Sequence, residues 1–159
     1  MPEITSYIPP CSPAPGTPTD DDDVEPSEIY RLYAPAAPTT ARVAREFVAA
    51  ALEATDRTSL IENALVCVSD LVTNVVQHAR VDDLSVEVAV CGDRVVVSVL
   101  DGDHARRPRR RVARDGQEDG RGLALVRCLS VASGVTFVWD QLNVVGKCVW
   151  FEPLARTGP

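Results

Sequence analysis

Three polar side chains are spaced four residues apart in the run DLVTNVVQHA (residues 70–79): the carboxylate of Asp70, the amide of Asn74 and the imidazole of His78. Residues four apart on a helix lie ~6 Å from each other, so these side chains would form one polar stripe. A carboxylate can orient a water or a hydroxyl group, and an amide oxygen suits a hard cation such as Mg²⁺. The spacing therefore predicts a cation site that serves a phosphate, unless the stripe is the ordinary solvent-facing side of an amphipathic helix.

A further carboxylate ends an apolar strand in the run VVVSVLDGD (residues 95–103). The run is rich in valine up to Asp101, and Gly102 follows. A carboxylate that is buried at the end of such a strand needs a hydrogen-bonding partner. Asp101 is therefore either a ligand-binding residue or a turn-forming residue at a strand end.

Glycines open a third segment, EDGRGLALV (residues 118–126), in which Gly120, Arg121 and Gly122 precede Leu123. Glycines at the start of a helix let backbone N–H groups approach phosphate oxygens, and the helix dipole favours an anion there. The guanidinium of Arg121 can add a charge-assisted contact. The segment predicts phosphate binding, with a plain first helical turn as the alternative.

The polar stripe needs a helix to hold it, and the sequence predicts one. From Ile61 onward, apolar residues recur at the spacing of three and four that is typical of a buried helical face. These residues are Ala64, Leu65, Val68, Leu71, Val72, Val75, Val76 and Ala79. The stripe lies off this face.

Strands and two further helices are predicted around that helix. The expected elements are a strand from Ile29 to Tyr33, a helix from a cap at Thr39 or Thr40 to about Glu53, a hairpin of Leu84–Val90 and Val95–Leu100 with a turn at Gly92-Asp93, a loop over 102–119, a helix from Gly120 to near Gly134, and strands Val135–Trp139 and Val144–Phe151. They predict an α+β fold, a two-layer sandwich with a mostly antiparallel sheet and helices on one face.

Composition limits the function further. A chain of 159 residues with 45% hydrophobic content supports one domain. The net charge of −7 argues against a dedicated nucleic-acid binder, whose surface would be basic. No apolar run approaches the ~20 residues that span a bilayer, and the first residues lack a signal-peptide pattern. We therefore expect a soluble cytoplasmic protein with no membrane partner.

The first 26 residues differ from the rest. They hold seven of the twelve prolines and the acidic run Asp20–Asp23, a composition that cannot bury enough apolar surface to offset chain entropy. This predicts a disordered tail over 1–26 and a folded domain over 27–155. The five cysteines are dispersed without a metal-binding spacing, and we expect them to be small buried hydrophobic residues.

In order and spacing, the three segments resemble the N box, the G1 box and the G2 box of the GHKL ATPase family. Within that family the sequence is most similar to the actinobacterial anti-sigma-factor serine/threonine kinases, and the resemblance runs from Glu28 to Leu154. It implies the Bergerat ATP-binding fold, with ATP and Mg²⁺ as cofactors. Members of the family commonly dimerise, but the sequence does not fix the oligomeric state.

The resemblance implies a role for each candidate residue. Asn74 would bind the Mg²⁺ that bridges the nucleotide phosphates, and Asp70 takes the place of the acid that activates the acceptor hydroxyl. Asp101, followed by Gly102, would accept the exocyclic amine of adenine.

The later boxes imply contacts with the phosphates. Gly120, Arg121, Gly122 and Leu123 correspond to the G2 box. Lys147, after Gly146, resembles the last glycine-containing box, although it can equally be a solvated strand residue. His78 would border the nucleotide, and an ordinary helix histidine is the alternative.

The function implied is that of a protein kinase that transfers the γ-phosphate of ATP to a serine of a small antagonist protein and binds a sigma factor. Two departures from the family pattern favour a non-catalytic ATP-binding or partner-binding module instead. Asp70 is shorter than the glutamate usual in the kinases, and the G1 box reads Asp101-Gly102-Asp103 without its later glycines.

Overall fold

The computed structural model describes residues 28–102, 121–140 and 143–157. The predicted tail over 1–26 and the predicted loop over 102–119, apart from Gly102, therefore lie outside the described residues. The elements are β1 (Glu28–Pro35), α1 (Thr40–Ala54), the short 3-10 helix η1 (Thr58–Leu60), α2 (Ile61–His78), β2 (Asp83–Cys91), β3 (Arg94–Asp101), α3 (Arg121–Cys128), β4 (Ser130–Asp140) and β5 (Asn143–Pro153).

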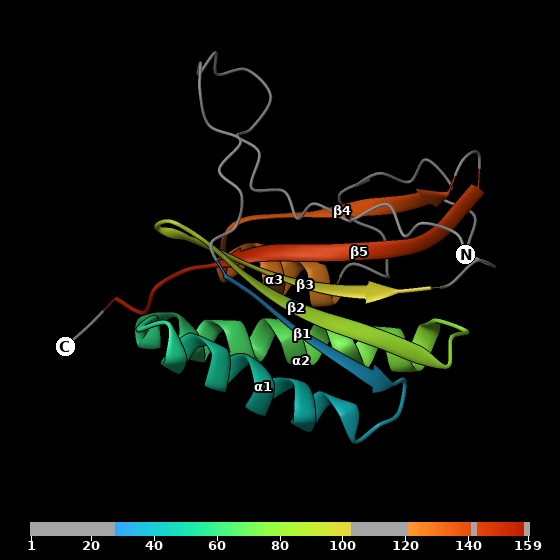
Figure 1. The fold of residues 1–159 in the computed structure, drawn as a ribbon, viewed down its shortest axis with the longest axis horizontal. Coiled ribbons are helices and arrows are strands. Elements are labelled where there is room, and N and C mark those ends of the chain that lie inside the picture. The colour runs from blue at the N-terminus through green and yellow to red at the C-terminus, as the bar shows by residue number, and fades with distance from the viewer. Residues whose placement is uncertain (1–27, 103–120, 141–142, 158–159) are drawn as a thin grey trace, which may run out of the picture.

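The strands form one antiparallel sheet in the order β1-β2-β3-β5-β4. The helices α1 and α2 cover one face of this sheet (Figure 1). Val126 of α3 belongs to the same buried cluster as the residues of α2, so α3 packs on that face too. The predicted α+β two-layer sandwich is confirmed.

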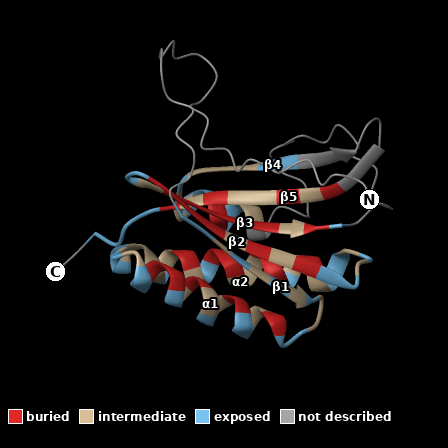
Figure 2. Cartoon of the chain, in the orientation of Figure 1, coloured by how far each residue is buried: buried red, intermediate tan, exposed pale blue. Residues whose placement is uncertain are grey.

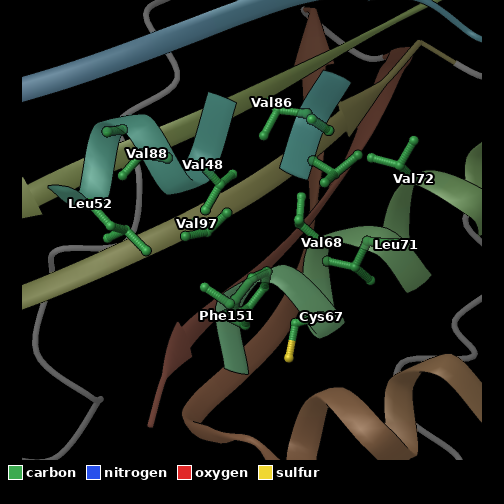
Figure 3. Close-up of a cluster of buried hydrophobic side chains, with 14 of the residues drawn as sticks. Val48, Leu52, Cys67, Val68, Leu71, Val72, Val86, Val88, Val97 and Phe151 are labelled. Atoms are coloured by element: carbon green, nitrogen blue, oxygen red, sulfur yellow. The ribbon is translucent and has the colours of Figure 1, made fainter. Parts of the chain in front are cut away.

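The core lies between the helices and the sheet, where Figure 2 shows the buried residues of α1 and α2. In α2 the buried side chains are Ala64, Cys67, Val68, Leu71, Val72 and Val75. They meet the valines of β2 and β3 and the side chain of Phe151, which is fully buried (Figure 3). The alternation along β3 explains this packing, because Val95, Val97 and Val99 all point to the helices.

Together with η1, the helix α2 forms a span, Thr58–His78, that is long and apolar enough to cross a membrane by length and composition alone. Its apolar face is nevertheless packed against the sheet as part of the core. This is the arrangement of the core helix of a globular domain.

The prediction that the third helix continues to near Gly134 was wrong, because α3 ends at Cys128 and β4 begins at Ser130. The backbone N–H of Leu154 donates to the carbonyl of Leu129 at 2.9 Å, where the chain enters the sheet. Gly134 pairs with Trp150, and a Cβ on Gly134 would lie 2.8 Å from the indole ring. The glycine therefore allows a close approach within a strand and does not end a helix.

Two smaller expectations also need correction. Thr39 is the residue that precedes α1, but its side chain makes no capping hydrogen bond. The buried Thr40 hydroxyl donates instead to the carbonyl of Pro35 at 2.6 Å. Among the cysteines, Cys67 and Cys148 are buried thiols as expected, whereas Cys128 is exposed and Cys91 is disulfide-bonded.

Candidate functional site

The polar stripe of Asp70, Asn74 and His78 runs along the side of α2 that faces α3. At 100° per residue, Cys67, Asn74 and His78 lie within about 40° of one another around the helix axis. Figure 3 shows the Cys67 sulfur pointing toward α3, and the side chain of Ser130, two residues after α3, lies against this thiol. Asp70 and Asn74 are half-buried on this side, while His78 is exposed.

Burial gives Asp70 the character of a stronger base. Desolvation raises the pKa of its carboxyl above the usual value, because a half-buried group lacks part of the hydration that would stabilise its ionised form. Among the residues that the structure describes, no cation forms an ion pair with it. A carboxylate whose pKa is raised toward the working pH is better suited to accept a proton.

Asp101 lies on the helix-facing side of the sheet, since it continues the alternation of Val97 and Val99 along β3. Its side chain is only 2% exposed. In the antiparallel register Lys147 of β5 is its direct partner, and the Lys147 Nζ lies 3.9 Å from the Asp101 Oδ2. The lysine thus compensates a carboxylate that would be costly to bury alone.

Gly146 brings β5 against the end of β3. A Cβ at this position would lie 2.6 Å from the carbonyl oxygen of Asp101, which is closer than real Cβ atoms approach. The backbone of β5 can therefore sit beside Asp101 only because residue 146 is glycine. This glycine was not among the predicted site residues, and only its place in the last glycine-containing box hinted at its role.

The topology brings the predicted segments to one end of the domain. Helix α2 ends at His78, and β2 begins at Asp83, beside the pair formed by Leu84 and Asp101. The opposite end holds the turn between β2 and β3, where Arg57 donates to the carbonyl of Gly92 at 2.6 Å.

Helix α3 begins toward the same end as the Asp101 side chain. It leads directly into β4, which runs parallel to β3 because both are antiparallel to β5. Figure 1 shows α3 lying along these strands, so its N-terminus points to the end where β3 finishes. The end of α2, the ion pair of Asp101 and Lys147, and the start of α3 therefore surround one corner.

The other predicted residues are placed with less detail. Arg121 and Gly122 form the first turn of α3, and Leu123 is half-buried against the core. Gly102 is exposed directly after β3. Gly120 falls outside the described residues, so its place in a phosphate-binding turn stays a prediction.

The corner fits a Mg²⁺ ion only in company with phosphates. Across residues 28–102, 121–140 and 143–157, no three His, Cys, Asp or Glu residues gather closely enough to hold a metal by themselves. The half-buried amide of Asn74 can supply one hard oxygen ligand. Mg²⁺ is commonly bound by one or two protein oxygens together with substrate phosphates and water, and the donor set here suits that mode.

Comparison with known proteins agrees with this geometry. Residues 34–151 match the family model described as histidine kinase-like ATPase domain (HATPase_c_2). The match spans well over half of the chain and includes every candidate residue from Asp70 to Lys147. No curated protein matches the chain.

Proposed function

Because the chain belongs to the histidine kinase-like ATPase domain family, we propose that it is an ATP-dependent serine/threonine protein kinase of the anti-sigma-factor type. Its substrate would be a serine of a small antagonist protein, and its second partner a sigma factor, both in the cytoplasm. ATP binding follows from the family itself. The observation that supports the rest is that Asp70 and Asn74 share the side of α2 that faces α3, and that α2 ends at the same end of the domain as Asp101.

Each residue would act on a different part of the reaction. Asp101 would hold the adenine, the first turn of α3 would donate backbone N–H groups to the phosphates, and Asn74 would ligate Mg²⁺, which supplies charge neutralisation on the phosphates. The serine oxygen would bond to the γ-phosphorus as the bond to the ADP oxygen breaks. The carboxylate of Asp70 would accept the proton that the serine loses.

A second candidate function is a non-catalytic module that binds ATP and holds a regulatory partner. It is favoured by the length of Asp70, which is one methylene shorter than glutamate. A base that is misplaced on the ~1 Å scale can cost ~100-fold in rate. The shorter side chain would therefore impair transfer while leaving ATP binding intact.

Phosphate transfer separates these functions. The full chain would be incubated with Mg²⁺, γ-labelled ATP and purified candidate antagonist proteins encoded by the same genome, and the product digested to locate the label. Label on a serine of one antagonist, lost with Asp70→Ala, supports the kinase. ATP binding in calorimetry without transfer to any antagonist supports the module, and failure to bind ATP overturns both.

A further inference from the structure

The ion pair between Asp101 and Lys147 is unusual in its position, because one partner is almost fully buried and the other reaches solvent. The Lys147 side chain is 30% exposed, against 2% for Asp101. Both point to the helix-covered face at the corner described above. The lysine is therefore the more accessible partner of the pair at this corner.

The separation of the two groups leaves the ammonium able to bind something else. At 3.9 Å, the distance from Nζ to Oδ2 exceeds the ~2.7–3.2 Å of an N–H···O hydrogen bond. An ammonium has three donors, and a carboxylate can accept several hydrogen bonds. The pair thus presents a donor beside an acceptor, and a ligand edge with the opposite pattern of donor and acceptor could bond to both.

Adenine offers the complementary pattern on its Watson–Crick edge. Its exocyclic amine is a donor and the adjacent ring nitrogen N1 is an acceptor. We propose that Lys147 is a specificity-determining residue that donates to N1 of adenine while Asp101 accepts from the amine. This assignment rests on the proposed ATP-binding function and adds a second reader of the base.

The pair would also reject bases with a 6-oxo group. Hypoxanthine carries a carbonyl where adenine has its amine and an N–H where adenine has its acceptor. In the same pose the carbonyl oxygen would face the carboxylate of Asp101, and the N–H would face the ammonium of Lys147. Buried groups left without partners discriminate strongly between ligands.

The test compares the affinities of the unsubstituted protein and of Lys147→Met for ATP and for ATP analogues, measured by calorimetry on the full chain. The analogue 1-deaza-ATP has a C–H in place of N1 and keeps the amine. The unsubstituted protein should bind it about tenfold more weakly than ATP, the scale of one hydrogen bond to a charged group. Lys147→Met should bind ATP and 1-deaza-ATP equally, and its preference for ATP over ITP should fall.

Two further variants keep the result interpretable. Lys147→Arg retains a donor and should keep most of the preference for ATP over 1-deaza-ATP. Arg156→Met removes an exposed cation that pairs with Glu62 at 2.7 Å, and it should leave all affinities unchanged. If Lys147→Met fails to fold, the comparison of the two nucleotides on the unsubstituted protein and on Lys147→Arg still decides.

The outcomes that would contradict the role of Lys147 differ from the outcome that would contradict the proposed function. Equal binding of ATP and 1-deaza-ATP by the unsubstituted protein would overturn the role of Lys147 and leave the proposed function standing. The same conclusion would follow if Lys147→Met left the ratio of the two affinities unchanged, since the lysine would then make no contact with N1. Absence of any ATP binding would overturn the proposed function as well.

Discussion

Gly146 lies so close to Asp101 that no other residue fits in its place. An ideal Cβ on Gly146 would be 2.6 Å from the Asp101 carbonyl oxygen and 3.6 Å from the side chain of Leu100. The nearest obstacle is backbone, which cannot rotate away as a flexible side chain would. The position of the buried carboxylate is therefore tied to the absence of a side chain on the neighbouring strand.

Gly146→Ala should force β5 away from β3 and displace Asp101. We expect a lower melting temperature and an ATP affinity reduced by about tenfold or more, because the displaced carboxylate could no longer accept its hydrogen bond from adenine. The matched control is Gly92→Ala. Gly92 has a φ of 61° and nothing within 4 Å of its Cβ position, so the substitution should cost about 1 kcal/mol of stability and no ATP affinity. Wild-type affinity in Gly146→Ala would contradict the assignment of this corner.

Asn74→Ala should remove the Mg²⁺-dependent part of ATP binding, because it deletes the amide oxygen that would ligate the cation. Calorimetric titrations with and without Mg²⁺ measure this part directly. Thr73→Ala changes the exposed neighbouring residue of the same helix and should bind ATP like the parent protein. An unchanged Mg²⁺ dependence in Asn74→Ala would show that the stripe does not hold the metal.

The sequence predicted those features of the fold that depend on local periodicity. The three-and-four spacing from Ile61 to Ala79 marked α2, and the alternating and valine-rich runs marked β2 and β3. The boundary between α3 and β4 was misplaced because Gly134 can end a helix as well as sit in a strand. The two possibilities are distinguished only by a contact between strands: the indole of Trp150, in β5, packs against Gly134 in β4.

The sequence predicted the individual residues of the candidate site but not the contacts between them. Asp70, Asn74 and Asp101 stood out by residue type and spacing. Their common location follows from antiparallel topology, which connects the end of α2 to the end of β3 through β2. The ion pair of Asp101 with Lys147 depends on the register between β3 and β5, and pairing between segments this far apart leaves no local pattern in the sequence.

The cysteines should differ in reactivity in the folded protein. Burial raises the pKa of Cys67 to about 11; the Ser130 hydroxyl partly offsets this rise, and the nearby charge of Asp70 adds to it by a smaller amount. Little thiolate forms at pH 8, and the thiolate is the reactive species. Iodoacetamide should therefore alkylate the exposed Cys128 and spare the buried Cys67 and Cys148.

Peptide mass mapping of the alkylated protein measures this difference. In urea all three thiols should react, which shows that burial and not sequence context protects them. Rapid alkylation of Cys67 in the native protein would mean that the packing between α2 and Ser130 opens readily.

Asp70 should reduce stability at neutral pH, because its pKa is raised in the folded state. The folded protein then binds this proton more tightly than the unfolded chain does. The tighter binding of this proton stabilises the folded protein in full below the ordinary pKa near 3.8. This stabilisation is lost as the pH rises through the raised pKa of the folded state. Asp70→Asn should accordingly melt at a higher temperature than the parent at pH 7, and the difference should disappear near pH 3.

The same substitution should damage the proposed reaction, since an amide cannot accept the proton of the serine hydroxyl. Asp70→Asn and Asp70→Ala are expected to lower phosphate transfer by orders of magnitude with little change in ATP affinity, whereas Asp70→Glu should preserve or raise it. Asp82→Asn, an exposed carboxyl change just beyond α2, serves as the control in melting and transfer assays. If Asp70→Asn is more stable at pH 7 and still transfers phosphate at the parental rate, burial of this carboxylate has no catalytic purpose, and the base must be sought elsewhere.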